Sequence, residues 1–102
     1  MNYDELSYLG TRLKYAIEIG AGGFNMMEDN FTVDIMRGPN TLHFDKEDLE
    51  LDANGHFYVC FDTMALGSGK VSARVTAYVP DTDFKDGVRV EVQKLDLINI
   101  HI

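Results

Sequence analysis

Three carboxylates in one short loop come nearest to a chemical site in this sequence. Asp81, Asp83 and Asp86 lie between two apolar, strand-like runs. Carboxylates at spacings of two and three residues in a loop can converge on a hard cation such as calcium, which prefers oxygen ligands. A solvated hairpin tip accounts for the same residues, and the twelfth position of an EF-hand loop carries no glutamate here. A calcium site and a plain hairpin tip are therefore the two alternatives for this loop.

The histidines and the single cysteine give no catalytic pattern. His56 and Cys60 share one face of a predicted strand, but four residues along a strand span about 13 Å, too far for a base to activate a thiol. His43 and His101 have no partner at a zinc-ligand spacing, and a zinc site needs three or four converging ligands. No Gly-x-Ser-x-Gly elbow is present. We therefore expect no catalytic residue, no cofactor and no enzymatic activity.

The stretch from Gly55 to Val79 predicts the elements around which the chain is organised. Apolar residues alternate with polar ones over 57–61 and again over 71–79, so each run predicts a half-buried strand with one apolar face. A compact corner joins the two runs. In that corner Asp62 or Thr63 is expected to cap a single helical turn that Gly67 ends.

The same period of two recurs along the rest of the chain. Further strands are predicted over 13–19, 31–36, 41–45 and 49–51, and from residue 88 to the C-terminus. Asn54-Gly55 predicts a hairpin turn. Slips of the apolar phase near Gln93-Lys94 and before Ile98 predict bulges or a strand that changes sheets. We expect an all-β, immunoglobulin-like, two-sheet antiparallel sandwich of about seven strands without a long helix, formed by residues 12–102. Residues 1–11 are expected to be a lead-in, either a frayed terminus with a few apolar residues on the sheet or a short helical turn that ends at Gly10.

Composition and charge restrict the partners. The 102 residues include 17 acids and 9 bases, for a formal net charge of −8. This balance argues against nucleic acid and against an anionic membrane surface, because both require clustered Lys and Arg. There is no apolar stretch of 18 residues, and Asp4 and Glu5 stand where a secretion signal carries positive charge. The expected location is inside a cell or in an assembly made there, such as a virion.

Outward strand positions and the C-terminus suggest contact surfaces. Tyr58, Arg74 and Tyr78 form one patch if the two long strands pair, although an ordinary cross-strand ladder explains the same residues. The C-terminal run contains three alternating isoleucines, Ile98, Ile100 and Ile102. An apolar, β-prone end needs a partner. It is expected either to complete a sheet within the domain or to add to the sheet of a neighbouring subunit.

The turn and corner motifs resemble those of immunoglobulin-like modules. Residues 54–59 read Asn-Gly-His-Phe-Tyr-Val, and residues 66–69 read Leu-Gly-Ser-Gly. Over residues 30–93 the chain resembles small domains of phage tail and baseplate proteins, such as the N-terminal domain of baseplate upper proteins. It departs from antibody-type domains because it lacks the cysteine pair, any tryptophan and a tyrosine corner.

The resemblance implies a virion or prophage structural protein that works by assembly and has no catalytic residue. A protein partner or self-association is then expected. The alternative function is a carbohydrate- or cell-surface-binding domain that uses Tyr58 and Tyr78, with a glycan as the partner.

Overall fold

The computed structural model describes residues 6–102. The strands are β1 (Leu6–Tyr8), β2 (Arg12–Ile17), β3 (Phe31–Arg37), β4 (Asn40–Asp45), β5 (Glu50–Leu51), β6 (Phe57–Asp62), β7 (Gly69–Pro80) and β8 (Val88–His101). Two single 3-10 turns, η2 (Lys46–Asp48) and η3 (Thr63–Ala65), complete the secondary structure of this region. The expectation of an all-β chain without a long helix is confirmed over these residues. Within them no helix is long and apolar enough to cross a membrane.

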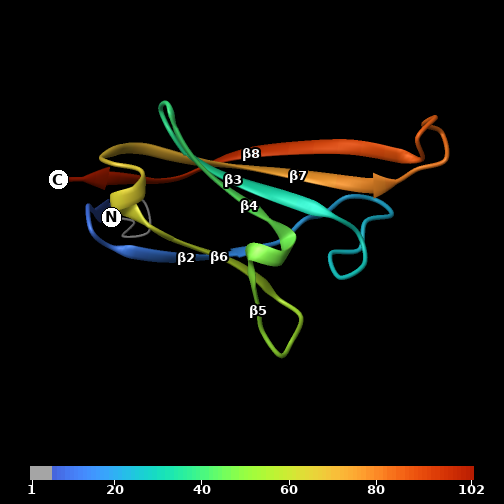
Figure 1. The fold of residues 1–102 in the computed structure, drawn as a ribbon, viewed down its shortest axis with the longest axis horizontal. Helices are drawn as coiled ribbons and strands as arrows, with labels where there is room; N and C mark the ends of the chain where they lie inside the picture. The colour runs from blue at the N-terminus through green and yellow to red at the C-terminus, as the bar shows by residue number, and fades with distance from the viewer. Residues whose placement is uncertain (1–5) are drawn as a thin grey trace.

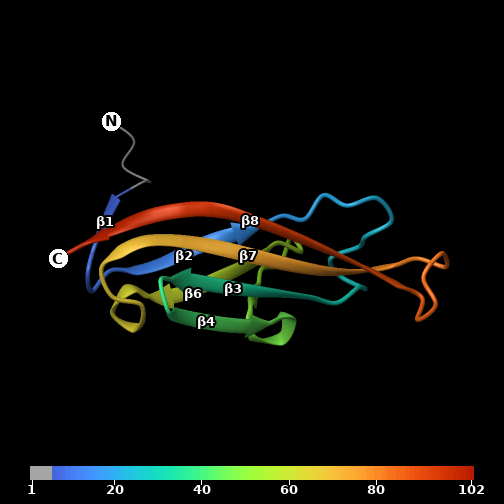
Figure 2. The same cartoon turned by 90° about the horizontal axis from the view of Figure 1, so that it is seen from above.

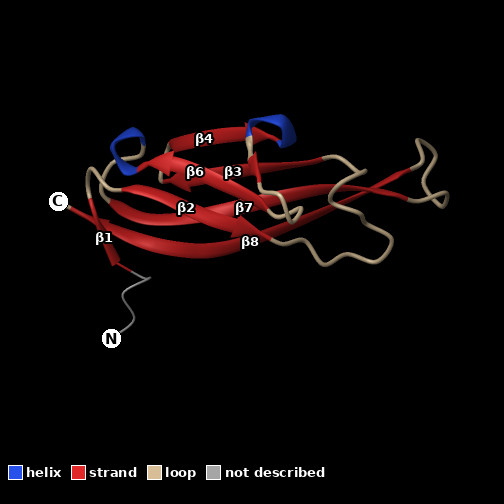
Figure 3. Cartoon of the chain, turned by 90° about the horizontal axis from the view of Figure 1, so that it is seen from below, coloured by secondary structure: helices blue, strands red, loops and turns tan. Residues whose placement is uncertain are grey.

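The strands form two facing sheets. The large sheet has the order β1-β8-β7-β3-β4, and the small sheet has the order β2-β6-β5 (Figure 2). Neighbouring strands are antiparallel except β1 and β8, which run parallel. Seen from below, β2 and β6 lie in front of the large sheet, and the 3-10 turns lie at its margins (Figure 3). The helical turn expected before Gly10 is wrong for residues 6–8, which form β1; residues 1–5 lie outside the described part of the chain.

The core lies between the two sheets. Phe31 of β3 meets the Phe57 ring edge-on, with the ring centroids 5.3 Å apart, and Phe24 contacts Phe31 in the same way. The inward positions of both sheets are buried, as their alternation predicts: Val33, Ile35, Val59, Phe61, Val71, Ala73 and Val75. Leu49, between η2 and β5, is also buried. Leu49 therefore extends the core to the segment where the chain passes from β4 to β5.

The corner between β6 and β7 forms as the sequence predicts. The Asp62 carboxylate accepts a hydrogen bond from the Met64 backbone N–H at 2.9 Å and caps η3. Leu66 is fully buried beneath the corner. Thr63 is also fully buried; its hydroxyl accepts from the Gly10 N–H at 2.8 Å and donates to the Thr11 carbonyl at 2.9 Å. The corner thereby holds the segment that links β1 to β2.

Two glycines in the corner are required by their geometry. Gly67 and Gly69 have φ angles of +89° and +130°, in the region that L side chains rarely adopt. A Cβ at Gly67 would lie 3.1 Å from Arg37 Nη2, and one at Gly69 would lie 3.0 Å from Arg37 Cδ. Arg37 needs this close approach, because its Nε donates to the Leu66 carbonyl at 2.9 Å. The Leu-Gly-x-Gly motif thus accommodates one arginine from β3.

The turn at Asn54-Gly55 is also confirmed. The Gly55 N–H donates to the Asp52 carbonyl at 3.2 Å, and the Asp52 N–H donates to the His56 carbonyl at 3.0 Å. Gly55 has a φ of +82°, whereas no non-glycine residue among those described has a positive φ, so Asn54 does not share this conformation. The turn therefore uses the conformational freedom of glycine alone.

Strand β8 departs from the sequence prediction. It pairs with β7 in a regular register from Val88 opposite Pro80 to Asp96 opposite Ser72, with no shift at Gln93-Lys94. The slip expected there is wrong. The slip before Ile98 is confirmed, because the register shifts opposite Val71/Ser72 and leaves Leu97 without a paired residue. The β7–β8 hairpin extends past the small sheet at the end far from the C-terminus (Figure 1).

Candidate interaction surface

A row of charged side chains crosses the outer face of the large sheet, the face turned away from the small sheet. Strand pairing sets Lys94 of β8 opposite Arg74 of β7, Arg74 opposite Asp34 of β3, and Asp34 opposite His43 of β4. Directly opposed residues in antiparallel strands lie on the same face. Asp34 is the buried member, since its side chain is only 9% exposed beneath its neighbours.

Asp34 is held from both sides. One carboxylate oxygen accepts from Arg74 Nη2 at 3.1 Å and Nε at 3.3 Å, and the other lies 2.6 Å from His43 Nδ1. The second imidazole nitrogen of His43 lies 3.0 Å from an Asp45 carboxylate oxygen. An imidazole that faces a carboxylate at each nitrogen donates from both when it is protonated.

The pKa shifts follow from these contacts. Burial alone raises the pKa of Asp34, but the hydrogen bonds from His43 and Arg74 outweigh it and hold that pKa below the ordinary 3.8. The hydrogen bond to Asp34, followed by the one to Asp45, raises the pKa of His43 above the ordinary 6.5. Both nitrogens of His43 and both oxygens of Asp34 are occupied. The cluster therefore links β3, β4 and β7 through the Asp34 carboxylate.

We expect His43 to make stability depend on pH. A pKa raised on folding stabilises the protein fully below the unfolded pKa of 6.5, and this contribution is lost as pH rises through the higher folded pKa. Asp34 acts with the opposite sign, so its contribution is present above 3.8 and lost as pH falls through its lowered pKa. Urea midpoints measured from pH 5 to 9 should fall in the wild type as pH rises above 6.5 and through the folded pKa of His43. The fall should be absent in His43→Gln; an identical profile in that variant would contradict the assignment.

A second feature of the same face is an apolar strip on the projecting hairpin. Val90 and Val92 are 54% and 56% exposed, and they stand opposite Tyr78 and Thr76 of β7. We define the β8 strip as Val88, Val90 and Val92; Tyr78 lies beside Val90 on the neighbouring strand β7. Exposed apolar side chains that cluster on one face can mark an interaction site.

The hairpin tip uses its carboxylates locally. Asp81 pairs with Arg89 at 2.6 Å and accepts from the Asp83 N–H at 2.9 Å, while Asp86 accepts from the Val88 N–H at 3.2 Å. The backbone hydrogen bond from Asp83, then Arg89, lowers the pKa of Asp81. Across residues 6–102 no three His, Cys, Asp or Glu side chains are grouped closely enough to hold a metal ion. The calcium hypothesis thus finds no ligand cluster at this loop.

The predicted aromatic patch is not assembled. Tyr58 belongs to β6 in the small sheet, whereas Arg74 and Tyr78 belong to β7 in the large sheet, and the two strands do not pair. All three point away from the core, so Tyr58 lies on the opposite side of the molecule from the other two. The Tyr58 hydroxyl donates to Asp52 at 3.1 Å, and Lys14 lies 4.5 Å from its ring centroid. The single patch of three residues is therefore corrected to two separate surfaces.

Cys60 is on the same small-sheet surface. Its thiol donates to a Glu50 carboxylate oxygen at 2.8 Å, and this hydrogen bond, with burial next, raises the pKa of the thiol. A raised pKa lowers the thiolate fraction, which is the reactive form. The hydrogen bond to Glu50 therefore favours the neutral thiol of Cys60.

The C-terminal isoleucines follow the first of the two alternatives. Ile98 and Ile100 are 6% and 3% exposed, because they complete the large sheet and face the core. They are therefore not available to a partner as the interface prediction required. Ile102, in contrast, is 94% exposed.

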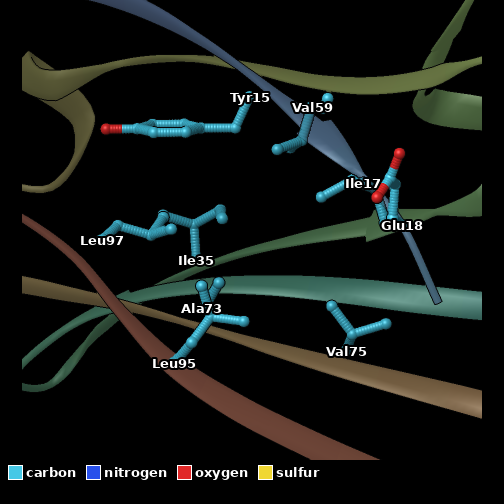
Figure 4. Close-up of a pocket in the computed structure, with 10 residues that line it drawn as sticks. Tyr15, Ile17, Glu18, Ile35, Val59, Ala73, Val75, Leu95 and Leu97 are labelled. Atoms are coloured by element: carbon cyan, nitrogen blue, oxygen red, sulfur yellow. The ribbon is translucent and has the colours of Figure 1, made fainter. Parts of the chain in front are cut away.

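A cavity of about 160 Å³ opens between the two sheets (Figure 4). Tyr15 and Val59 from the small sheet face Ile35 and Leu97 from the large sheet, and Glu18 supplies the charged group of the lining. Binding sites for small molecules generally combine an apolar lining with several convergent polar groups. The lining is mostly apolar, and Glu18 is its charged side chain.

Comparisons with protein-family models, curated proteins and solved structures found no match. What the chain does is therefore inferred from its surfaces. Of these, the outer face of the large sheet combines an ordered charge row with an exposed apolar strip. Within the charge row, the Asp34–His43 pair was open to prediction, since the Arg37–Asn40 turn fixes which residues of the two flanking strands face each other.

Proposed function

We propose that this chain is a non-catalytic binding or assembly module with an immunoglobulin-like β-sandwich fold. The strand order supports the fold. With β2 to β8 lettered B, C, C′, D, E, F and G, the sheets have the orders G-F-C-C′ and B-E-D. In immunoglobulin-like domains the F strand likewise lies between C and G in one sheet, and B, E and D are neighbours in the other.

The observation that carries the proposal is the exposed β8 strip. Val90 and Val92 stand in a regular strand beside a fixed row of charges, so the face is both apolar and well ordered. Protein interfaces combine such an apolar centre with a polar rim. The ionisable groups that a small active site would use, such as His43 and Cys60, are instead held by neighbouring carboxylates.

The resemblance of residues 30–93 to phage tail and baseplate domains extends the proposal to a virion component. In that setting the outer face of the large sheet contacts another protein of the assembly. The glycan-binding alternative has less support from the geometry, because Tyr58 and Tyr78 lie on opposite surfaces and form no common stacking platform.

Photo-cross-linking tests the proposal in cells that express the chain. A benzophenone amino acid replaces Val92 on the proposed face, and in a matched variant it replaces Lys14 on the opposite face; both positions are exposed. We expect a discrete cross-linked product from position 92 and little from position 14, as mass spectrometry of the products would show. Equal products from both positions, or none from position 92, would contradict a binding role for this face.

A further inference from the structure

Within residues 6–102, most of one edge of β8 has no neighbouring strand. β8 pairs with β7 along its length, and on its other side it pairs with β1 at Asn99, Ile100 and His101. Among residues 6–102 no strand pairs with that edge from Val88 to Ile98. The pairing with β1 shows that this edge accepts a strand. A free edge presents unpaired backbone N–H and C=O groups that another chain can pair with.

The free edge lacks two of the features that usually prevent such pairing, and its charged residues Arg89, Glu91 and Lys94 carry both signs. From Val88 to Asp96 the strand has no proline and no bulge. Its outer face carries the exposed Val90 and Val92 instead of charges at these positions. The edge and the apolar strip therefore coincide on one segment, and both remain uncovered within the described part of the chain.

We propose that a second copy of this chain covers this segment, by antiparallel pairing of β8 with β8 about a two-fold axis at Val90. In an antiparallel pair related by such an axis, residues equally far from Val90 on either side stand opposite each other. Val90 then faces the partner's Val90. Val88 of each copy faces the partner's Val92, and Arg89 of each copy faces the partner's Glu91. The apolar residues and the opposite charges are thus matched at every position from 88 to 92.

Neighbouring registers do not give this match. An axis at Glu91 or at Arg89 sets that charge against its own copy, which is unfavourable. An axis at Val92 sets Val90 against the partner's Lys94 and Arg89 against the partner's Leu95. A two-fold axis that falls between two residues is excluded, because it would set a residue of the outer face opposite a residue of the inner face. The Val90-centred register is therefore the complementary one among those near the strip.

This inference rests on the proposed function and names its partner: a second copy that joins two large sheets into one continuous sheet. Val88, Val90 and Val92 of both copies form one apolar cluster on the outer face. Tyr78 of β7 is the cross-strand neighbour of Val90 on the same face and extends this cluster. Such edge-to-edge contact is isologous, so it closes as a dimer and does not propagate into a fibre.

Disulfide trapping tests the register. In a Cys60→Ser background, Val90→Cys sets two thiols across the axis, with Cα atoms about 4.5–5.5 Å apart, within the range of a disulfide. Val92→Cys, equally exposed, sets its thiols about 13 Å apart along the strands. Under mild oxidation we expect a covalent dimer from Val90→Cys and little from Val92→Cys. The reverse result would overturn the register, and no dimer from either would overturn the pairing.

Sedimentation equilibrium of the purified chain over a concentration series tests the dimer itself. Val90→Lys sets two positive charges at the axis, so we expect the dimer dissociation constant to rise by about tenfold or more. Thr41→Lys, at an exposed position of the far edge strand of the same sheet, should leave it unchanged. A wild-type monomer at all concentrations would overturn the inference. The binding role would survive that result if position 92 still cross-linked to a different protein in cells.

Discussion

Replacing Phe31 with alanine should lower the free energy of unfolding by about 3–5 kcal/mol. Phe31 is fully buried, and its ring lies between the rings of Phe24 and Phe57, with centroid distances of 6.1 and 5.3 Å. Its loss removes apolar contacts from both sheets and leaves a cavity between them. Since small domains are stable by only about 5–15 kcal/mol, the variant should lose a large share of its stability at 25 °C.

Urea denaturation followed by far-ultraviolet circular dichroism measures the effect, with Phe84→Ala as the matched control. Phe84 is the same residue type, but it lies at the hairpin tip and is 47% exposed. Its removal should change the free energy of unfolding by less than about 1 kcal/mol. If both variants lose the same stability, Phe31 does not have the central packing role assigned here.

Strands and turns were predictable where their signals are local. The alternation of Phe57, Val59 and Phe61 reports burial on one face because these residues face a second sheet. Asp62 and Gly67 act on their own turn, so the cap and its end were visible without tertiary information. The corner therefore formed as expected, including the buried leucine beneath it.

Strand β8 was not predictable by the same rule. Its first half extends past the small sheet, so within residues 6–102 no strand covers its inner face in the way that β6 covers β3. Polar groups occupy that face instead: Arg89 donates to the Gly22 carbonyl at 2.9 Å and pairs with Asp81. The valines consequently lie on the outer face. The apolar face of a strand therefore points inward only where a second layer packs against that strand.

Which side chains share a surface depends on which sheet each strand joins, and the local sequence of a strand does not specify this. Tyr58 and Tyr78 occupy consecutive strands, yet the corner carries the chain from one sheet to the other and separates them. Asp34 and His43, in contrast, lie on strands joined by a tight turn, and the register of that hairpin brings them within 2.6 Å. Close pairs across a tight turn are open to prediction from sequence, whereas pairs across the corner are not.

Asp34→Ala should lower the free energy of unfolding by about 1–3 kcal/mol, the cost of leaving hydrogen-bonding groups without their partner. The carboxylate is the shared acceptor for Arg74 and His43, so its loss breaks the charge row at its centre. The larger penalty of a fully buried ion pair does not apply. Arg74 and His43 are 47% and 53% exposed, and water can solvate them once the acid is gone.

The same variant has a readout that packing loss alone does not produce. Because the hydrogen bond to Asp34 is the leading cause of the raised pKa of His43, that pKa should fall toward 6.5 in Asp34→Ala, as NMR titration of the imidazole would measure. Asp96→Ala removes the exposed ion pair with Lys70 and should leave both stability and the His43 pKa nearly unchanged. If the His43 pKa stayed fixed in Asp34→Ala, the coupling between β3 and β4 would not run through this carboxylate. The row would then be a set of independent surface charges.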